Sequence, residues 1–148
     1  MKLSTRSTYG MRALVELGLA ASGRSPLSAT AIASKQDLSV AYLEQLLHRL
    51  KKHGLVQSVR GPKGGYILDK EPDQITIGEI VRVLDGSVTK SNGHDADSPR
   101  HAQRIAHAVF RCVHERLATA LDHVTLQDLC DDVRGLSEPL EHRYVFHI

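Results

Sequence analysis

The chain has 148 residues, enough for one domain with a sizeable hydrophobic core. Its two cysteines are too few for a disulfide framework, and no apolar run reaches the roughly 18 residues of a membrane span. Residues 1–85 hold 12 Lys or Arg and 8 Asp or Glu, whereas residues 86–148 hold 7 and 9. This composition argues against secreted disulfide-rich and membrane-spanning proteins, and the basic N-terminal part favours contact with nucleic acid. Because Arg12 and Glu16 break the first apolar stretch, it does not resemble a secretory signal, and we expect a cytoplasmic protein.

Three amphipathic helices are predicted within the first 53 residues. They cover residues 6–22, 28–36 and 40–53, and the residues expected to cap them are Ser4 or Thr5, Ser28 and Ser39. Asp37 and Ser39 mark a tight turn between the second and third helices. The third helix carries its leucines at helical spacing, which predicts a buried face and a polar face. Two helices joined by a short turn, the second of them amphipathic, are typical of a helix-turn-helix.

A β-hairpin is predicted directly after the third helix. Gly54 ends that helix, LVQSVR alternates apolar and polar residues as a half-buried strand does, and YIL returns as a second strand. The turn between them, GPKGG, is rich in glycine and contains Lys63. Arg60 directly precedes it. A helix, a strand and a basic hairpin in this order are the sequence form of a recognition helix followed by a wing. A further helix is expected from Thr76 to Leu84.

The C-terminal part predicts a loop and a long helix. Residues 86–99 are polar and read as an exposed loop, and residues 100–122 carry apolar side chains every four positions, such as Ile105, Val109 and Val113. So small a chain leaves this apolar stripe little to pack on, which predicts pairing with a second copy. A short helix capped by Thr125 follows, and the tail 134–148 is expected to be loosely ordered.

These elements predict a mainly α fold with a small β-hairpin: a winged helix-turn-helix plus a long C-terminal dimerisation helix. We divide the chain into a DNA-binding domain (1–85), a loop (86–99), the dimerisation helix with the short helix (100–133), and the tail (134–148).

Candidate DNA contacts lie on the third helix, in the wing and before the first helix. The first turns of a recognition helix reach base edges, and basic side chains further along meet phosphates. Gln pairs with adenine, Glu accepts a hydrogen bond from cytosine, and a basic wing tip enters a minor groove. The predicted DNA-binding residues are Ser39, Ala41, Tyr42, Glu44, Gln45, Arg49, Arg60, Lys63, Lys2 and Arg6. A solvated helix face and an ordinary hairpin would explain any one of these residues, but not their ordered combination.

At these residues the sequence resembles the IscR-type winged-helix regulators, the family that also includes NsrR, RirA and CymR. The most specific pieces are LSVAYLEQLLHRLKKHGLVQSVRGPKGGY and ITIGEIVRVLDG. The resemblance implies a homodimer built by the long helix. It also implies binding to double-stranded DNA at a near-palindromic promoter site, most often as a repressor.

The sequence departs from the cluster-binding members of that family in its sensor region. Their cysteines would fall near Asn92, Ser98 and Arg104, none of which supplies a thiolate. An iron–sulfur cluster needs about four thiolate or imidazole ligands, so the sequence predicts no cluster and no bound metal. The alternative is an iron–sulfur or metal-sensing regulator with unusual His or Cys ligands.

Two residues of the long helix are candidate sensors. Cys112 is either a small packing residue or part of a thiol switch, with Cys130 or with a partner subunit's thiol, and His107 lies on a basic face that is either solvated or effector-binding. We therefore expect a response to thiol oxidation, a small effector or a regulatory protein. No nucleophile with an adjacent base is evident, so no catalytic residues are predicted and the protein is not expected to be an enzyme. A protein-binding winged helix is the alternative from another class.

Overall fold

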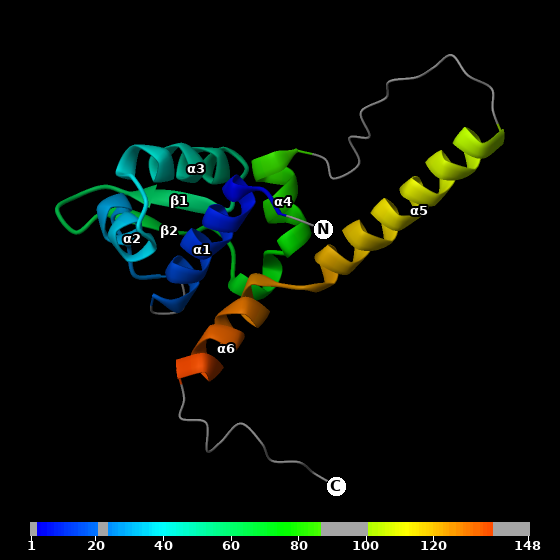
Figure 1. Ribbon diagram of the computed structural model, residues 1–148. Helices are drawn as coiled ribbons and strands as arrows, with labels where there is room; N and C mark the ends of the chain where they lie inside the picture. Colours follow the sequence, from blue (N-terminus) through cyan, green and yellow to red (C-terminus); the bar gives the residue numbers. More distant parts are fainter. Residues whose placement is uncertain (1–2, 21–23, 87–100, 138–148) are drawn as a thin grey trace, which may run out of the picture.

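The computed structural model describes residues 3–20, 24–86 and 101–137. Helices and one two-stranded sheet make up the fold, and a long helix, α5, projects away from the rest (Figure 1). The elements are α1 (Thr5–Leu19), α2 (Ala29–Gln36), α3 (Val40–Lys52), β1 (Val56–Val59), β2 (Gly65–Leu68), the 3₁₀ helix η2 (Pro72–Gln74), α4 (Ile77–Asp85), α5 (His101–His123) and α6 (Leu126–Ser137). This confirms a mainly α fold with a small β-hairpin. No helix of the described ranges is long and apolar enough to cross a membrane.

Serine caps begin the three N-terminal helices. The hydroxyl oxygens of Ser4, Ser28 and Ser39 each accept a hydrogen bond from the backbone N–H three residues later, which satisfies a donor that the helix cannot. Between α2 and α3, Asp37 adopts a left-handed conformation with φ 53°, which an aspartate tolerates better than most residues. The caps and this turn fix the helix-turn-helix that the sequence predicts.

One apolar core lies beneath α3. Its buried side chains come from α1, α2, α3, α4 and α6 and from the end of the hairpin, and Leu121 of α5 packs against it. The α3 leucines that the sequence placed inward are all fully or almost fully buried: Leu43, Leu46, Leu47 and Leu50. Burial of these residues leaves the opposite face of α3 to solvent.

The hairpin follows α3 as an antiparallel pair in which Val56 faces Leu68 and Val59 faces Gly65. Its far strand also pairs with Leu27, since the N–H of each of Leu27 and Tyr66 donates to the other's carbonyl, at 3.0 and 2.8 Å. Gly65 has φ 152°, and a Cβ there would lie 2.3 Å from the Leu27 carbonyl oxygen. Glycine at this position therefore lets the backbone of the α1–α2 connection brace the hairpin.

The C-terminal helices attach to the core through α6. Leu126 and Cys130 are fully buried, and a Cβ on Gly18 of α1 would lie 2.7 Å from the Cys130 sulfur. Thr125 begins α6 in a reciprocal capping arrangement with Asp128, whose carboxylate accepts from the Thr125 N–H at 2.8 Å. Thus α6 anchors the C-terminal part in the core, and α5 meets the winged helix where it contacts α4.

Two predicted helix ends need correction. The first helix ends at Leu19 rather than at residue 22. The last helix runs to Ser137, beyond the end at residue 133 that the sequence suggested. Arg134 explains part of this extension, because its guanidinium pairs with Asp131 one turn earlier at 3.2 Å and lies near the negative end of the helix dipole.

Candidate nucleic-acid interface

The exposed face of α3 carries the side chains predicted to read bases. Ala41, Glu44 and Gln45 are exposed on the first two turns, opposite the buried leucines. Within the described ranges, the carboxylate of Glu44 and the amide of Gln45 form no side-chain hydrogen bond or ion pair. Ser39, by contrast, uses its hydroxyl oxygen to accept from the Tyr42 N–H at 3.2 Å, so its first role is to start the helix.

Tyr42 is held against α1 by an aromatic contact that the sequence did not reveal. Its ring meets the ring of Tyr9 edge to face, with centroids 6.1 Å apart, and the guanidinium of Arg12 lies 5.1 Å from the centroid of Tyr9. Arg12 also donates to the Gln36 side chain at 2.5 Å and to the Gln36 carbonyl at 3.2 Å, at the end of α2. These contacts fix the side of α3 next to the helix-turn-helix turn.

The tip of the hairpin holds the basic residues predicted for the wing. Arg60 and Lys63 are exposed in the loop between β1 and β2, and the Gly64 N–H donates to the Gly61 carbonyl at 3.0 Å to close that loop. Gly61 has φ 118°, a conformation that favours glycine. The hairpin thus carries two exposed cations on a short, hydrogen-bonded turn, and its two strands run alongside α3 (Figure 1).

Basic residues further along α3 are engaged within the protein. Arg49 donates to the Leu84 carbonyl at 3.2 Å, which ties α3 to the end of α4, and Lys51 donates to the Ser58 hydroxyl at 2.7 Å, which ties α3 to β1. Both side chains still reach solvent, but these bonds give them a structural role that helix periodicity alone could not show.

The residues predicted before α1 are placed in part. Lys2 lies outside the described residues, and Arg6 is about half exposed with its Nε 3.7 Å from the carboxylate of Asp85. That carboxylate also accepts hydrogen bonds from the hydroxyls of Ser4 and Ser7. The Ser7 hydroxyl donates at 2.6 Å, and Ser7 is fully buried. Asp85 therefore fastens the start of α1 to the end of α4, next to the Arg49 contact.

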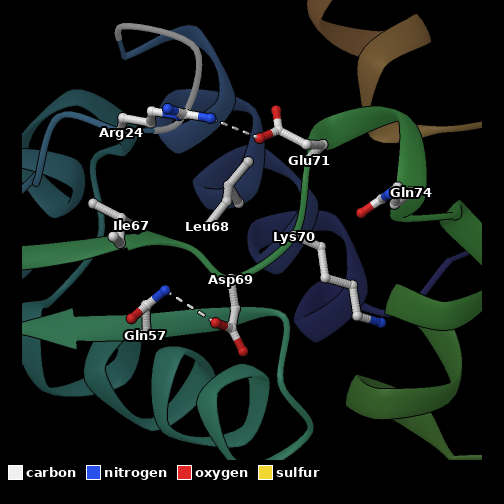
Figure 2. Close-up of a pocket in the computed structure, with 8 residues that line it drawn as sticks. All are labelled: Arg24, Gln57, Ile67, Leu68, Asp69, Lys70, Glu71 and Gln74. Atoms are coloured by element: carbon white, nitrogen blue, oxygen red, sulfur yellow. Dashed lines mark hydrogen bonds and ion pairs between the residues drawn. The ribbon is translucent and has the colours of Figure 1, made fainter.

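A shallow pocket of about 380 Å³ lies at the other end of the hairpin (Figure 2). Arg24 pairs with Glu71 at 3.3 Å across it, and Gln57 donates to Asp69 at 3.0 Å. Its charged and amide groups are largely engaged with one another, and neither Arg60 nor Lys63 lines it. It therefore does not contribute to the surface formed by α3 and the wing.

The candidate sensor residues lie apart from each other. His107 and Cys112 are exposed on α5, whereas Cys130 is buried on α6 and burial raises the pKa of its thiol. The structure therefore does not bring Cys112 and Cys130 together. Within the described ranges, no three His, Cys, Asp or Glu side chains gather in a way that could hold a metal ion.

Comparisons with known proteins agree with this architecture. Residues 3–132 match the model of the Rrf2 family, described as an iron-dependent transcriptional regulator. The chain is 36% identical to the transcriptional regulator CymR of Bacillus subtilis over the full length of both proteins. The structure matches that of CymR, the global cysteine regulator of B. subtilis, with a TM-score of 0.76 and 36% identity over 89% of this chain and 98% of that one. It matches the structure of T. potens IscR with a TM-score of 0.77 and 38% identity over 97% of this chain and 96% of that one. The chain belongs to the Rrf2 family of DNA-binding transcriptional regulators, which are not enzymes.

Proposed function

We propose that the protein is a homodimeric, sequence-specific regulator that represses transcription from a near-palindromic promoter site. The observation that carries this proposal is the joint surface of α3 and the wing. Exposed Glu44 and Gln45 lie on the first turns of a helix that a capping serine and buried leucines hold in place, beside the cations Arg60 and Lys63. Such a helix fits the major groove, and such a wing fits the adjacent minor groove or its phosphates.

The apolar face of α5 supports the homodimer. Four large apolar side chains on this helix are more than half exposed: Ile105, Val109, Phe110 and Val113. They follow one another at helical spacing over more than two turns, so they form one continuous stripe. A second copy of α5 offers the same stripe and would remove both from water. Two copies would then present two recognition helices to the two halves of a palindrome.

The regulatory signal that we propose is thiol oxidation, a small ligand or a protein partner, and not an iron–sulfur cluster. The whole sequence contains two cysteines, and one of them, Cys130, is fully buried in the core. Two cysteines, one of them in the core, cannot supply the thiolates of a usual cluster, and the described residues bring no three His, Cys, Asp or Glu side chains together to replace them. Exposed Cys112 and His107 remain the candidate sensor residues of the described part of the chain.

Substituting Gln45 tests the base-reading role of α3. We expect Gln45→Ala to lower affinity for the preferred DNA sequence by about 1–3 kcal/mol and to relax the preference at one base pair of each half-site, because a lost base contact affects that pair alone. The measurement is sequence selection from a random duplex library, followed by titration of the enriched sequence and its single-base variants.

Arg60→Ala is the matched comparison, because Arg60 is also exposed but lies in the wing. If Arg60 contacts phosphate, its loss should weaken binding to all sequences by a similar factor and reduce the slope of log affinity against log salt by about one. Unchanged affinity and unchanged base preference for both variants would show that α3 and the wing do not dock on DNA in this way.

A further inference from the structure

The direction of α5 is set at one end, where the helix meets α4. Arg82 of α4 donates to both carboxylate oxygens of Asp122, at 3.2 and 2.8 Å, and the Thr76 hydroxyl lies 3.4 Å from the same carboxylate. Arg82 and Asp122 thus form a bidentate salt bridge, which fixes the relative orientation of the two side chains as well as their distance. We refer to Thr76, Gly78, Arg82 and Asp122 as the α4–α5 joint.

Gly78 makes room for this contact. A Cβ at Gly78 would lie 2.0 Å from an Asp122 carboxylate oxygen and 3.0 Å from the Arg82 guanidinium. Any other residue at this position would push the Asp122 side chain away from the place where Arg82 and Thr76 hold it. The glycine on one helix and the carboxylate on the other therefore fit together at the joint.

Backbone hydrogen bonds hold the chain just beyond the joint. The Ile77 N–H donates to the Val124 carbonyl at 2.9 Å, and the Leu126 N–H donates to the Ile75 carbonyl at 2.8 Å. These bonds fix the position at which α5 ends, and the Arg82–Asp122 contact lies one turn of α5 or less from them. Further along α5, Ile105, Val109 and Val113 are more than half exposed. Thus α5 acts as a lever arm that is held against α4 at its C-terminal end.

The length of this arm amplifies small rotations. From Asp122 to Ile105 the helix rises by about 26 Å, at roughly 1.5 Å per residue. A rotation of about 10° at the joint would move the far end by about 4–5 Å, whereas one base pair advances the DNA axis by about 3.4 Å. A small rotation at the joint, which leaves the helices folded, would therefore displace the far end of α5 by more than the rise of one base pair.

We propose that Arg82 and Asp122 are positioning residues that set the separation of the two DNA-reading surfaces, and so the half-site spacing that the protein prefers. This inference rests on the proposed function, in which the apolar stripe of α5 pairs with a second copy. Because the pair is exposed, its loss should change the free energy of unfolding little. Its effect should instead appear in the geometry of the dimer.

The test compares three DNA duplexes. The first is the palindrome that the wild-type full-length chain enriches from random-sequence DNA, and the others have one base pair added to or removed from its centre. Each change shifts one half-site by about 3.4 Å and rotates it by about 35°. Wild-type protein should bind the enriched spacing at least about tenfold more tightly than either altered spacing.

Asp122→Asn and Arg82→Gln should each reduce this spacing discrimination to about threefold or less, with an unchanged thermal unfolding midpoint and dimer dissociation constant. Glu71→Gln is the matched control, because it removes an exposed ion pair with Arg24 that includes no residue of the joint. It should keep the wild-type discrimination. Wild-type discrimination in both joint variants, or an equal loss of affinity for all three duplexes, would overturn the inference.

Gly78→Ala supplies an independent variant. It should reduce spacing discrimination in the wild-type chain but cause no further loss in an Asp122→Ala background, because the carboxylate that its methyl group would meet is then absent. Equal effects in the two backgrounds would contradict the role of the joint. A wild-type chain that enriches no sequence, or that stays monomeric, would contradict the proposed function itself and the inference with it.

Discussion

Replacing Val113 by aspartate will turn the protein into a monomer and lower its affinity for the enriched palindrome by about 10²–10⁴-fold, the usual gain from joining two binding modules. Val113 is 54% exposed in the single chain and is one of the four residues of the apolar stripe of α5. In a dimer it would be buried, and an aspartate there would carry an unpaired charge into an apolar interface. Analytical ultracentrifugation and DNA titration measure the two effects.

Ala108→Asp is the matched control for this substitution. It adds the same charge to the same helix, at an exposed position that helical geometry places about 140° around the helix from Val113. It should leave the dimer and DNA affinity close to the wild type. Should both variants stay dimeric, α5 would not form the dimer through this stripe.

Leu47→Ala will lower the free energy of unfolding by about 2–5 kcal/mol, which is a large part of the stability of a small domain. The Leu47 side chain lies fully buried on the inner face of α3. Its truncation therefore leaves a cavity in the core that holds the recognition helix. Urea unfolding followed by circular dichroism measures the change.

The exposed neighbour of Leu47 provides the control. His48→Ala changes a solvent-facing side chain of the same helix and should alter the free energy of unfolding by no more than about 0.5 kcal/mol. A similar loss in both variants would mean that α3 is not held by its leucine face.

Local signals predicted most of the fold. Ser28 and Ser39 cap the helices that follow them, and the leucines of α3 are buried as their spacing indicates. The alternation of LVQSVR and the glycines of GPKGG predicted the hairpin. Each of these signals acts within a few residues of the chain, so it can be recognised without knowing how the helices pack.

Contacts between distant residues could not be predicted in this way. Asp85 binds Ser7 across 78 residues of sequence, and Arg82 binds Asp122 across 40. Helix periodicity places such side chains on a face but does not say which other helix meets that face. The same limit applies to Arg49, which the sequence offered only to DNA and which the fold also uses to hold the end of α4.

The sequence predicted the exposure of the candidate DNA-contacting residues, while their role in binding stays a prediction. Glu44, Gln45, Arg60 and Lys63 are all exposed, as base and phosphate contacts require. Residues 86–99, which the sequence identified as the loop that carries the sensor in relatives, lie outside the described residues except for Gly86. Regulation therefore remains the part of the account that depends most on chemistry at His107 and Cys112.

Binding to specific and non-specific DNA tests the central claim most directly. The full-length protein should bind the duplex that it enriches from random-sequence DNA at least about 10³-fold more tightly than a scrambled duplex of the same length. The titration belongs at about 0.15 M salt, where exposed charges are screened beyond about 8 Å. The account predicts this ratio, with two protomers on each specific duplex. Weak binding of equal strength to both duplexes, falling steeply with salt, would contradict it.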